Sequence, residues 1–325
     1  MAANESLLFI DSNKYLDLYR LKPTKKLLLL LGDLTDYIFV TKQIVNEVQR
    51  NQVLTAVRFV RDNFENMSCK TLGLPDWWSS TDVNQRNDIV NSMKEITKNI
   101  NETNTKVETL VITMMEQISH IEDEVSKALL PIFDKAVPHS SDELRRARER
   151  KELGNPPGKR TDAIGDQLTW EQILTNFQGK KRLWIISSDK DYGETYKKRG
   201  FLNSFLYKEL CNIVSKPEVY LFDDLSAGIT DFVKVTEIKT EQQLSPTEIE
   251  EIESAEKSLP PMNELVESIL RSLENSKRQR QQQFLQYAEE FEQQKQERLL
   301  QMKESNEQRL EERRRMFLGD TDSIT

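Results

Sequence analysis

Four acidic side chains stand where the sequence could build a metal site. Asp11 and Asp189 each follow a short apolar run, whereas Glu47 and Asp166 each lie near the start of a helical stretch. Carboxylate oxygens are the ligands that Mg²⁺ and Mn²⁺ prefer. A divalent ion lowers the pKa of a bound water and offsets charge on an attacked phosphate. Four such carboxylates in one place would therefore indicate metal-dependent phosphodiester hydrolysis.

Each of the four acids also has a local interpretation. Asp11 could cap a helix, and Glu47 could be a solvated helix residue. Asp166 could satisfy the first turn of its helix, and Asp189 could begin an Asx turn. A cluster without a cation would be costly, because the carboxylates repel one another and at least one pKa rises. Their convergence on one place is what separates the two interpretations.

The composition narrows the chemistry further. The chain holds two histidines and two cysteines in 325 residues, so catalysis by a histidine pair, a histidine-rich zinc site and a disulfide framework are all disfavoured. The net charge of -8 argues against broad nonspecific binding to nucleic acid. The apolar run 27–31 is far shorter than the ~20 residues that span a bilayer. We therefore expect a cytoplasmic protein that does not enter a membrane.

The pattern of secondary structure around these acids predicts an α/β fold. Apolar runs of strand length alternate with helical stretches at 25–34 and 41–63, which predicts a parallel sheet. In such sheets ligands bind beyond the carboxyl ends of the strands, where Asp11 and Asp189 stand. The predicted strands are residues 6–10, 37–40, 182–186 and 219–222.

A long heptad pattern separates the two halves of this predicted sheet. Apolar residues alternate in steps of four and three, with Thr103 the only polar residue on the seam. The pattern favours one helix over 85–132, roughly 70 Å long at ~1.5 Å per residue, although 99–104 could form a turn. The seam positions are 89, 93, 96, 100, 107, 111, 114, 118, 121, 125, 128 and 132.

The last third of the chain is also helical in composition. Residues 245–248, Ser-Pro-Thr-Glu, have the form of a capping box with proline at the first helical position. Residues 276–317 are almost entirely Gln, Glu, Lys and Arg, with sparse apolar positions. We expect an extended C-terminal helix that needs a partner for stability.

Four motifs in order resemble those of the PIN-domain nucleases, in particular a larger bacterial PIN-like branch with a helical insertion. They are Phe9-Ile-Asp11-Ser-Asn13, Phe39-Val-Thr-Lys-Gln-Ile-Val-Asn-Glu47, Gly154-Asn-Pro-Pro-Gly-Lys159 with Ile164-Gly-Asp166, and Ile186-Ser-Ser-Asp189-Lys-Asp-Tyr192. The resemblance implies a three-layer α/β/α catalytic domain at 1–65 and 140–235, a coiled-coil insertion at 66–139 and a helical extension at 236–325.

The resemblance also assigns roles to the acids. It implies that Asp11, Glu47, Asp166 and Asp189 are catalytic and bind Mg²⁺ or Mn²⁺. Asn13 would orient the site, and Asp191 is a possible fifth acid. The implied activity is endonucleolytic cleavage, with RNA favoured over DNA. A role as an effector in bacterial antiphage defence or a toxin-like system follows by analogy.

Basic and aromatic residues near the acids are candidates for substrate contacts. Lys159, Arg160 and Lys190 flank the acids and could bind phosphates. Trp77, Trp78 and Trp170 could stack on bases, although Trp170 is better explained as core packing.

Two other functions share these features. A non-catalytic PIN-like scaffold would display the coiled-coil helices, and a nuclease that cuts DNA would use the same four acids. In each case the long helices would mediate self-association or bind a partner protein.

Overall fold

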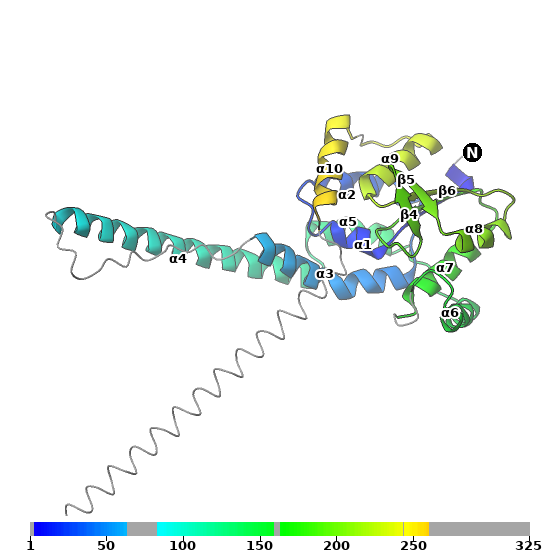
Figure 1. Ribbon diagram of the computed structural model, residues 1–325, viewed down its shortest axis with the longest axis horizontal. Helices are drawn as coiled ribbons and strands as arrows, with labels where there is room; N and C mark the ends of the chain where they lie inside the picture. The colour runs from blue at the N-terminus through cyan, green and yellow to red at the C-terminus, as the bar shows by residue number, and fades with distance from the viewer. Residues whose placement is uncertain (1–2, 64–82, 159–162, 243, 260–325) are drawn as a thin grey trace, which may run out of the picture. The chain divides into compact units, whose positions relative to one another are not determined.

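The computed structural model describes residues 3–63, 83–158, 163–242 and 244–259 (Figure 1). The chain divides into compact units at residues 1–259 and 260–325, and the second lies outside the described residues. The strands are β1 Ser6–Ile10, β2 Ile38–Phe39, β3 Arg182–Ile186, β4 Gly193–Tyr196, β5 Arg199–Leu202 and β6 Glu218–Phe222. The helices are α1 Ser12–Asp17, α2 Lys25–Asp33, α3 Lys42–Asn63, α4 Val83–Ser119, α5 Glu124–Phe133, α6 Ser141–Leu153, α7 Gly165–Asn176, α8 Ser204–Cys211, α9 Leu225–Thr236 and α10 Pro246–Ser258.

Four strands form the predicted parallel sheet, in the order β2-β1-β3-β6. Leu8 pairs with Ile38 on one side and with Trp184 on the other, and Trp184 pairs with Tyr220. The parallel arrangement confirms the prediction from the alternating runs. It also brings the carboxyl ends of β1 and β3 together at one edge of the sheet.

Helices cover both faces of this sheet. On one face the Trp184 ring meets Phe232 of α9 edge-on, with the ring centroids 5.1 Å apart. On the other face Phe9 lies against Tyr192, which in turn packs beside Trp170 of α7. Strands that are buried on both faces read as continuous apolar runs, which is why β1 and β3 are evident in the sequence. The three-layer α/β/α architecture is confirmed.

The prediction of one helix over 85–132 was wrong. Helix α4 runs through 99–104 without a turn and ends at Ser119, and α5 begins separately at Glu124. Between them Ile121 takes a left-handed backbone conformation (φ 61°). The Asp123 side chain then accepts a 2.9 Å hydrogen bond from the Ser126 backbone and caps α5. In Figure 1, α4 extends away from the sheet.

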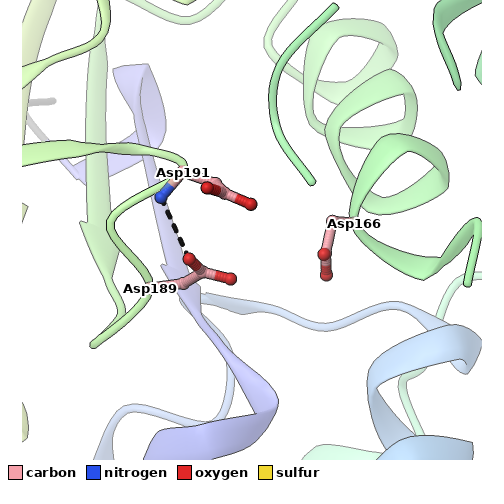
Figure 2. Close-up of side chains that lie close together, drawn as sticks. All are labelled: Asp166, Asp189 and Asp191. Carbon is pink, nitrogen blue, oxygen red and sulfur yellow. Dashed lines mark hydrogen bonds between the residues drawn. The ribbon is translucent and has the colours of Figure 1, made fainter. Parts of the chain in front are cut away.

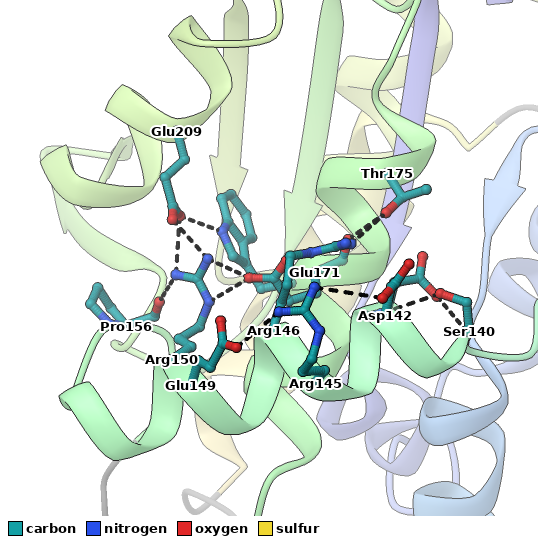
Figure 3. A network of polar contacts seen from close by, with 12 residues as sticks. Ser140, Asp142, Arg145, Arg146, Glu149, Arg150, Pro156, Glu171, Thr175 and Glu209 are labelled. Atoms are coloured by element: carbon teal, nitrogen blue, oxygen red, sulfur yellow. Dashed lines mark hydrogen bonds and ion pairs between the residues drawn. The ribbon is translucent and has the colours of Figure 1, made fainter.

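A buried arginine ties α6 to α7 and α8 (Figure 3). The guanidinium of Arg150 donates to Glu171 of α7 at 2.6 Å and to Glu209 of α8 at 2.7 Å. It also donates to the carbonyl oxygen of Pro156 at 2.7 Å. The indole nitrogen of Trp170 donates to Glu209 at 2.8 Å. Arg150 therefore joins three helices and the loop that leads toward Asp166.

Helix α10 carries the predicted capping box, which the structure confirms between Ser245 and Glu248. Farther along α10, the buried Glu256 accepts a 2.7 Å bond from the Leu225 backbone at the start of α9. The expected helix at 276–317 lies outside the described residues, and the three predicted segment boundaries stay predictions. Among the described helices, none combines the length and apolar character needed to cross a membrane.

Candidate metal centre

Asp11 lies where β1 ends and α1 begins. Its side chain caps α1 through a 2.8 Å hydrogen bond from the Ser12 backbone, so the local interpretation of this residue is confirmed. The same carboxylate accepts bonds from the Ser187 hydroxyl at 2.6 Å and from the Asn13 amide at 2.7 Å. The Asp11 side chain therefore caps α1 and at the same time lies at the carboxyl edge of the sheet.

Ser187 and Asn13 join the ends of β1 and β3. The Ser187 hydroxyl, while donating to Asp11, accepts a 2.9 Å bond from the Asp189 backbone. The Asn13 side-chain oxygen accepts a 3.3 Å bond from the Ser188 backbone. These contacts depend on the register of β1 against β3, so the sequence marked Asn13 only by resemblance and did not mark Ser187 at all.

Three acids bring their oxygens close together beyond the sheet edge. One oxygen each from Asp166, Asp189 and Asp191 lies within 4.8 Å of the other two. Figure 2 shows Asp166 on α7 facing the other two, which lie on the loop after β3. The Asp189 side chain accepts a 3.0 Å bond from the Asp191 backbone, so the predicted Asx turn is present and places both carboxylates on this loop.

Asp11 and Glu47 are not part of that group of three, but they act on it electrostatically. Burial raises the pKa of Asp166 to about 8, and the charges of Asp11, Asp189, Glu47 and Asp191 add to the rise. Burial likewise raises the pKa of Asp11 to about 6, against the hydrogen bond from Ser187 and with the charge of Glu47.

The pKa of Glu47 is also raised, chiefly by burial. A hydrogen bond from the Ser12 side chain and the charge of Arg50 oppose that rise, and the charge of Asp189 adds to it. The four acids singled out in the sequence thus share one electrostatic environment. Asp191, which the sequence marked only as a possible fifth acid, lies close to Asp166 and Asp189.

The backbone at Gly158 passes close to the Asp166 carboxylate. Gly158 has a left-handed backbone (φ 82°), and a Cβ atom there would stand 3.1 Å from Oδ2 of Asp166 and collide with the Gln167 side chain. Only glycine lets this loop pass so near the carboxylate. The motif Asn-Pro-Pro-Gly therefore has a packing reason for its last residue.

The donor set fits a small divalent cation. Oxygens that share one Mg²⁺ ion stand about 3 to 4.2 Å apart, from metal–oxygen distances of ~2.1 Å. The oxygens of Asp166, Asp189 and Asp191 lie within 4.8 Å of one another, so they would have to approach by roughly 1–2 Å to share such an ion. Burial is the main cause of the raised pKa values of Asp11 and Asp166, and neighbouring carboxylates add negative charge that a bound cation would offset.

The predicted substrate contacts are only partly described. Lys190 is exposed between Asp189 and Asp191, whereas Lys159, Arg160, Trp77 and Trp78 lie outside the described residues. Trp170 is fully buried, which confirms its interpretation as core packing.

The comparisons with known proteins agree with this architecture. A family model described as "PIN like domain" matches residues 7–193, which is more than half of the chain and includes all five acids. No curated protein and no solved structure gives a significant match. PIN-like domains are generally nucleases that use divalent metals. With a parallel α/β/α fold and an acidic sheet edge inside the matched region, this chain belongs to the PIN-like domain family.

Proposed function

We propose that this chain is a metal-dependent endonuclease that hydrolyses phosphodiester bonds, with RNA as the favoured substrate. The observation that carries the proposal is the convergence of acids at the carboxyl edge of the sheet, where burial and mutual repulsion raise the pKa of Asp166 to about 8. Such an arrangement is costly for the free protein, and a cation bound at the edge would offset both the charge of the carboxylates and that of a phosphodiester.

In this proposal Asp11, Glu47, Asp166 and Asp189 hold Mg²⁺ or Mn²⁺. Asp191 joins them, because its oxygen lies within 4.8 Å of those of Asp166 and Asp189. The ion supplies a water of lowered pKa and offsets charge on the attacked phosphate. Ser187 and Asn13 hold the Asp11 carboxylate in place through bonds of 2.6 and 2.7 Å. Hydrogen-bond partners of this kind orient metal ligands and typically matter 10–100-fold for metal affinity or activity.

The substrate side of the site would be basic. Lys190 is exposed between two of the acids, and Lys159 and Arg160 precede Asp166 in the sequence. Contacts from such residues to phosphates position a strand without reading its bases. They serve RNA and DNA alike, so the preference for RNA rests on the family and must be measured.

The long helix α4 would serve association. Its seam residues Ile89 and Ile96 are each 49% exposed, which is unfavourable for an isolated helix and favourable for a face that meets another helix. We propose that α4 mediates self-association or binds a partner protein. A cytoplasmic effector of antiphage defence or of a toxin-like system would combine such an arm with a nuclease.

A cleavage assay tests the catalytic proposal. Labelled single-stranded RNA and DNA are incubated with Mn²⁺ and with wild type, Asp11→Asn or Asp166→Asn. We expect cleavage by wild type and a loss of at least about 100-fold in each variant, because each removes a negatively charged ligand. Binding of Mn²⁺ is measured in parallel by calorimetry.

The calorimetric measurement separates the remaining outcomes. Variants that cleave as fast as wild type would refute the proposed site. A wild type that binds Mn²⁺ through these acids but cleaves only when its partner is added would be a restrained nuclease. A wild type that neither binds Mn²⁺ nor cleaves would be a scaffold that displays α4.

A further inference from the structure

A two-stranded hairpin begins two residues after Asp191. It consists of β4 and β5, and the backbone of Asn203 at its end donates a 2.8 Å bond to the carbonyl oxygen of Tyr192. A Cβ atom at Gly200 would collide with the carbonyl oxygen of Leu221, so β5 lies directly against β6. The hairpin is therefore held against the sheet beside the acidic edge.

The pairing of β4 with β5 determines which side chains share a face. Tyr196 pairs with Arg199, and Glu194 pairs with Phe201. Because side chains alternate along a strand and paired residues lie on the same side, these four residues occupy one face. Gly193 and Gly200 have the opposite parity, and they lie against Leu221 of β6. The face with Tyr196, Arg199, Glu194 and Phe201 is thus the one turned away from the sheet.

This outward face is aromatic and basic. The Tyr196 side chain is 65% exposed and that of Phe201 is 49% exposed. A cation stands 5.5 Å from the centroid of each ring, Lys197 over Tyr196 and Arg199 over Phe201. Diagonal neighbours on paired strands are ~7–8 Å apart, which is about two steps of a stacked nucleic-acid strand at ~3.4 Å each.

The turn of the hairpin adds two lysines at positions whose backbone conformation disfavours large side chains. Lys197 and Lys198 both have left-handed backbones, with φ of 48° and 62°. Turns of this kind strongly prefer Asn-Gly, because residues with larger side chains are strained there. The nearby opposite charges are Glu194 on the same face and Glu253, which lies 3.9 Å from the Lys198 ammonium group. The Lys198 side chain is nevertheless 86% exposed.

We propose that the outward face of this hairpin, together with its Lys-Lys turn, binds a single-stranded nucleic acid whose chain continues to the acidic edge. Bases would stack on Tyr196 and Phe201, and phosphates would contact Lys197, Lys198 and Arg199. The six residue-to-residue steps from Asp191 to Lys197 span at most ~20 Å, so the turn is within about six nucleotides of the acids. This inference rests on the proposed nuclease function and names where its substrate lies.

Binding is tested with the full chain carrying Asp166→Asn, so that the probe stays intact. The probes are 12-nucleotide single strands of RNA and of DNA, followed by fluorescence anisotropy between 50 and 300 mM salt. One variant adds Tyr196→Ala and Phe201→Ala. We expect its affinity to fall by at least about 30-fold, because the variant removes two stacking contacts and each contributes roughly 5-fold or more.

A second variant carries Lys197→Asn and Lys198→Gly. Asn-Gly suits this turn better than Lys-Lys, so the hairpin should fold at least as well. We expect the slope of log affinity against log salt to become shallower by about 1.4, since each phosphate contact on a single strand contributes ~0.7. The matched control, Lys127→Gln with Lys216→Gly, removes two exposed lysines elsewhere, and Lys216 is also left-handed (φ 54°). It should bind as the parent does.

The outcomes separate this inference from the catalytic proposal. Weaker binding by the ring variant together with a shallower salt slope in the turn variant supports the inference even if the wild type cleaves nothing. Cleavage with unchanged binding in both variants overturns the inference and leaves the nuclease intact, and the face would then suit a protein partner. A parent that binds neither probe at 50 mM salt also overturns it. Tighter binding of one probe identifies RNA or DNA as the ligand.

Discussion

At the scale of single residues, one hydroxyl group joins the two halves of the candidate site. Ser187 donates to Asp11 and accepts from the Asp189 backbone, so the two acids at the strand ends are held by the same side chain. Asp11 and Asp189 also keep their local roles as a helix cap and an Asx turn. Local stabilisation therefore offsets part of the cost of placing negative charges together.

The charge on Asp166 should make the metal-free protein less stable as pH rises. Its pKa is raised to about 8 in the folded chain, against ~3.9 when unfolded, so the unfolded chain loses this proton first. The contribution of this group to stability is thus highest below pH ~4 and is lost progressively up to pH ~8. We expect wild type to lose about 1–3 kcal/mol more than Asp166→Asn between pH 5 and 8, because the side chain is partly exposed.

Urea unfolding in the presence of a chelator measures this difference. Asp88→Asn, at an exposed position on α4, serves as the control and should follow wild type at both pH values. Saturating Mn²⁺ should reduce the advantage of Asp166→Asn at pH 8, since the cation offsets the repulsion. Equal pH dependence in wild type and Asp166→Asn would show that deprotonation of this carboxylate does not lower the stability of the protein.

At the scale of elements, Arg150 is the main polar link between α6, α7 and α8. Its side chain is 6% exposed, as are few arginines, and Glu171 beside it is 5% exposed. Replacing Arg150 by Met would leave Glu171 with Arg146 as its cation and would remove the arginine from Glu209. We expect Arg150→Met to lower the free energy of unfolding by about 3 kcal/mol, because two partly buried carboxylates then lose a hydrogen-bonded cation.

The adjacent turn of α6 provides a matched control. Arg145 pairs with Asp142 and Glu149 on the surface, and its side chain is 60% exposed. Arg145→Met should leave the thermal unfolding midpoint unchanged within error. A similar loss of stability in both variants would mean that helix propensity, and not the buried network, accounts for the effect.

The elements that the sequence predicts are those with strong local signals. β1 and β3 are continuous apolar runs, and α10 has its capping box. The end of α4 was missed because the seam keeps its phase to 132, while the capping signal at Asp123 is a single residue. The hairpin was missed because Lys197-Lys198 replaces the usual turn residues.

The candidate site was predictable only in part, for a related reason. Acids at strand ends are visible as soon as the strands are, which identifies Asp11 and Asp189. Their bonds through Ser187 join residues that are 176 positions apart and follow from strand register alone. The place of Asp191 beside Asp166 depends on the Asx turn and on the packing of α7, and neither has a sequence signature strong enough to rank it first.

At the scale of the whole molecule, association through α4 can be tested by seam position. We expect Ile89→Asn with Ile96→Asn to shift a self-associated species to monomer in sedimentation velocity, since both residues lie on the predicted seam. Ile112→Asn is the control, because Ile112 is 53% exposed but lies off that seam. Identical sedimentation of wild type and the seam variant would exclude self-association by this face and leave a partner protein.

The order of the strands along the chain determines when the acidic edge comes into existence. β1 must pair with β3, and the Asp11–Ser187 bond closes a stretch of 176 positions. Closing a flexible loop of that length costs about 4–5 kcal/mol in chain entropy, beyond a length-independent part. Until β3 has been synthesised and has docked, Asp11 has neither Ser187 nor Asp189 beside it. For the ribonuclease proposed above, a nascent chain emerging from the ribosome would therefore be inactive, and its own messenger RNA would not be cleaved until translation is well advanced.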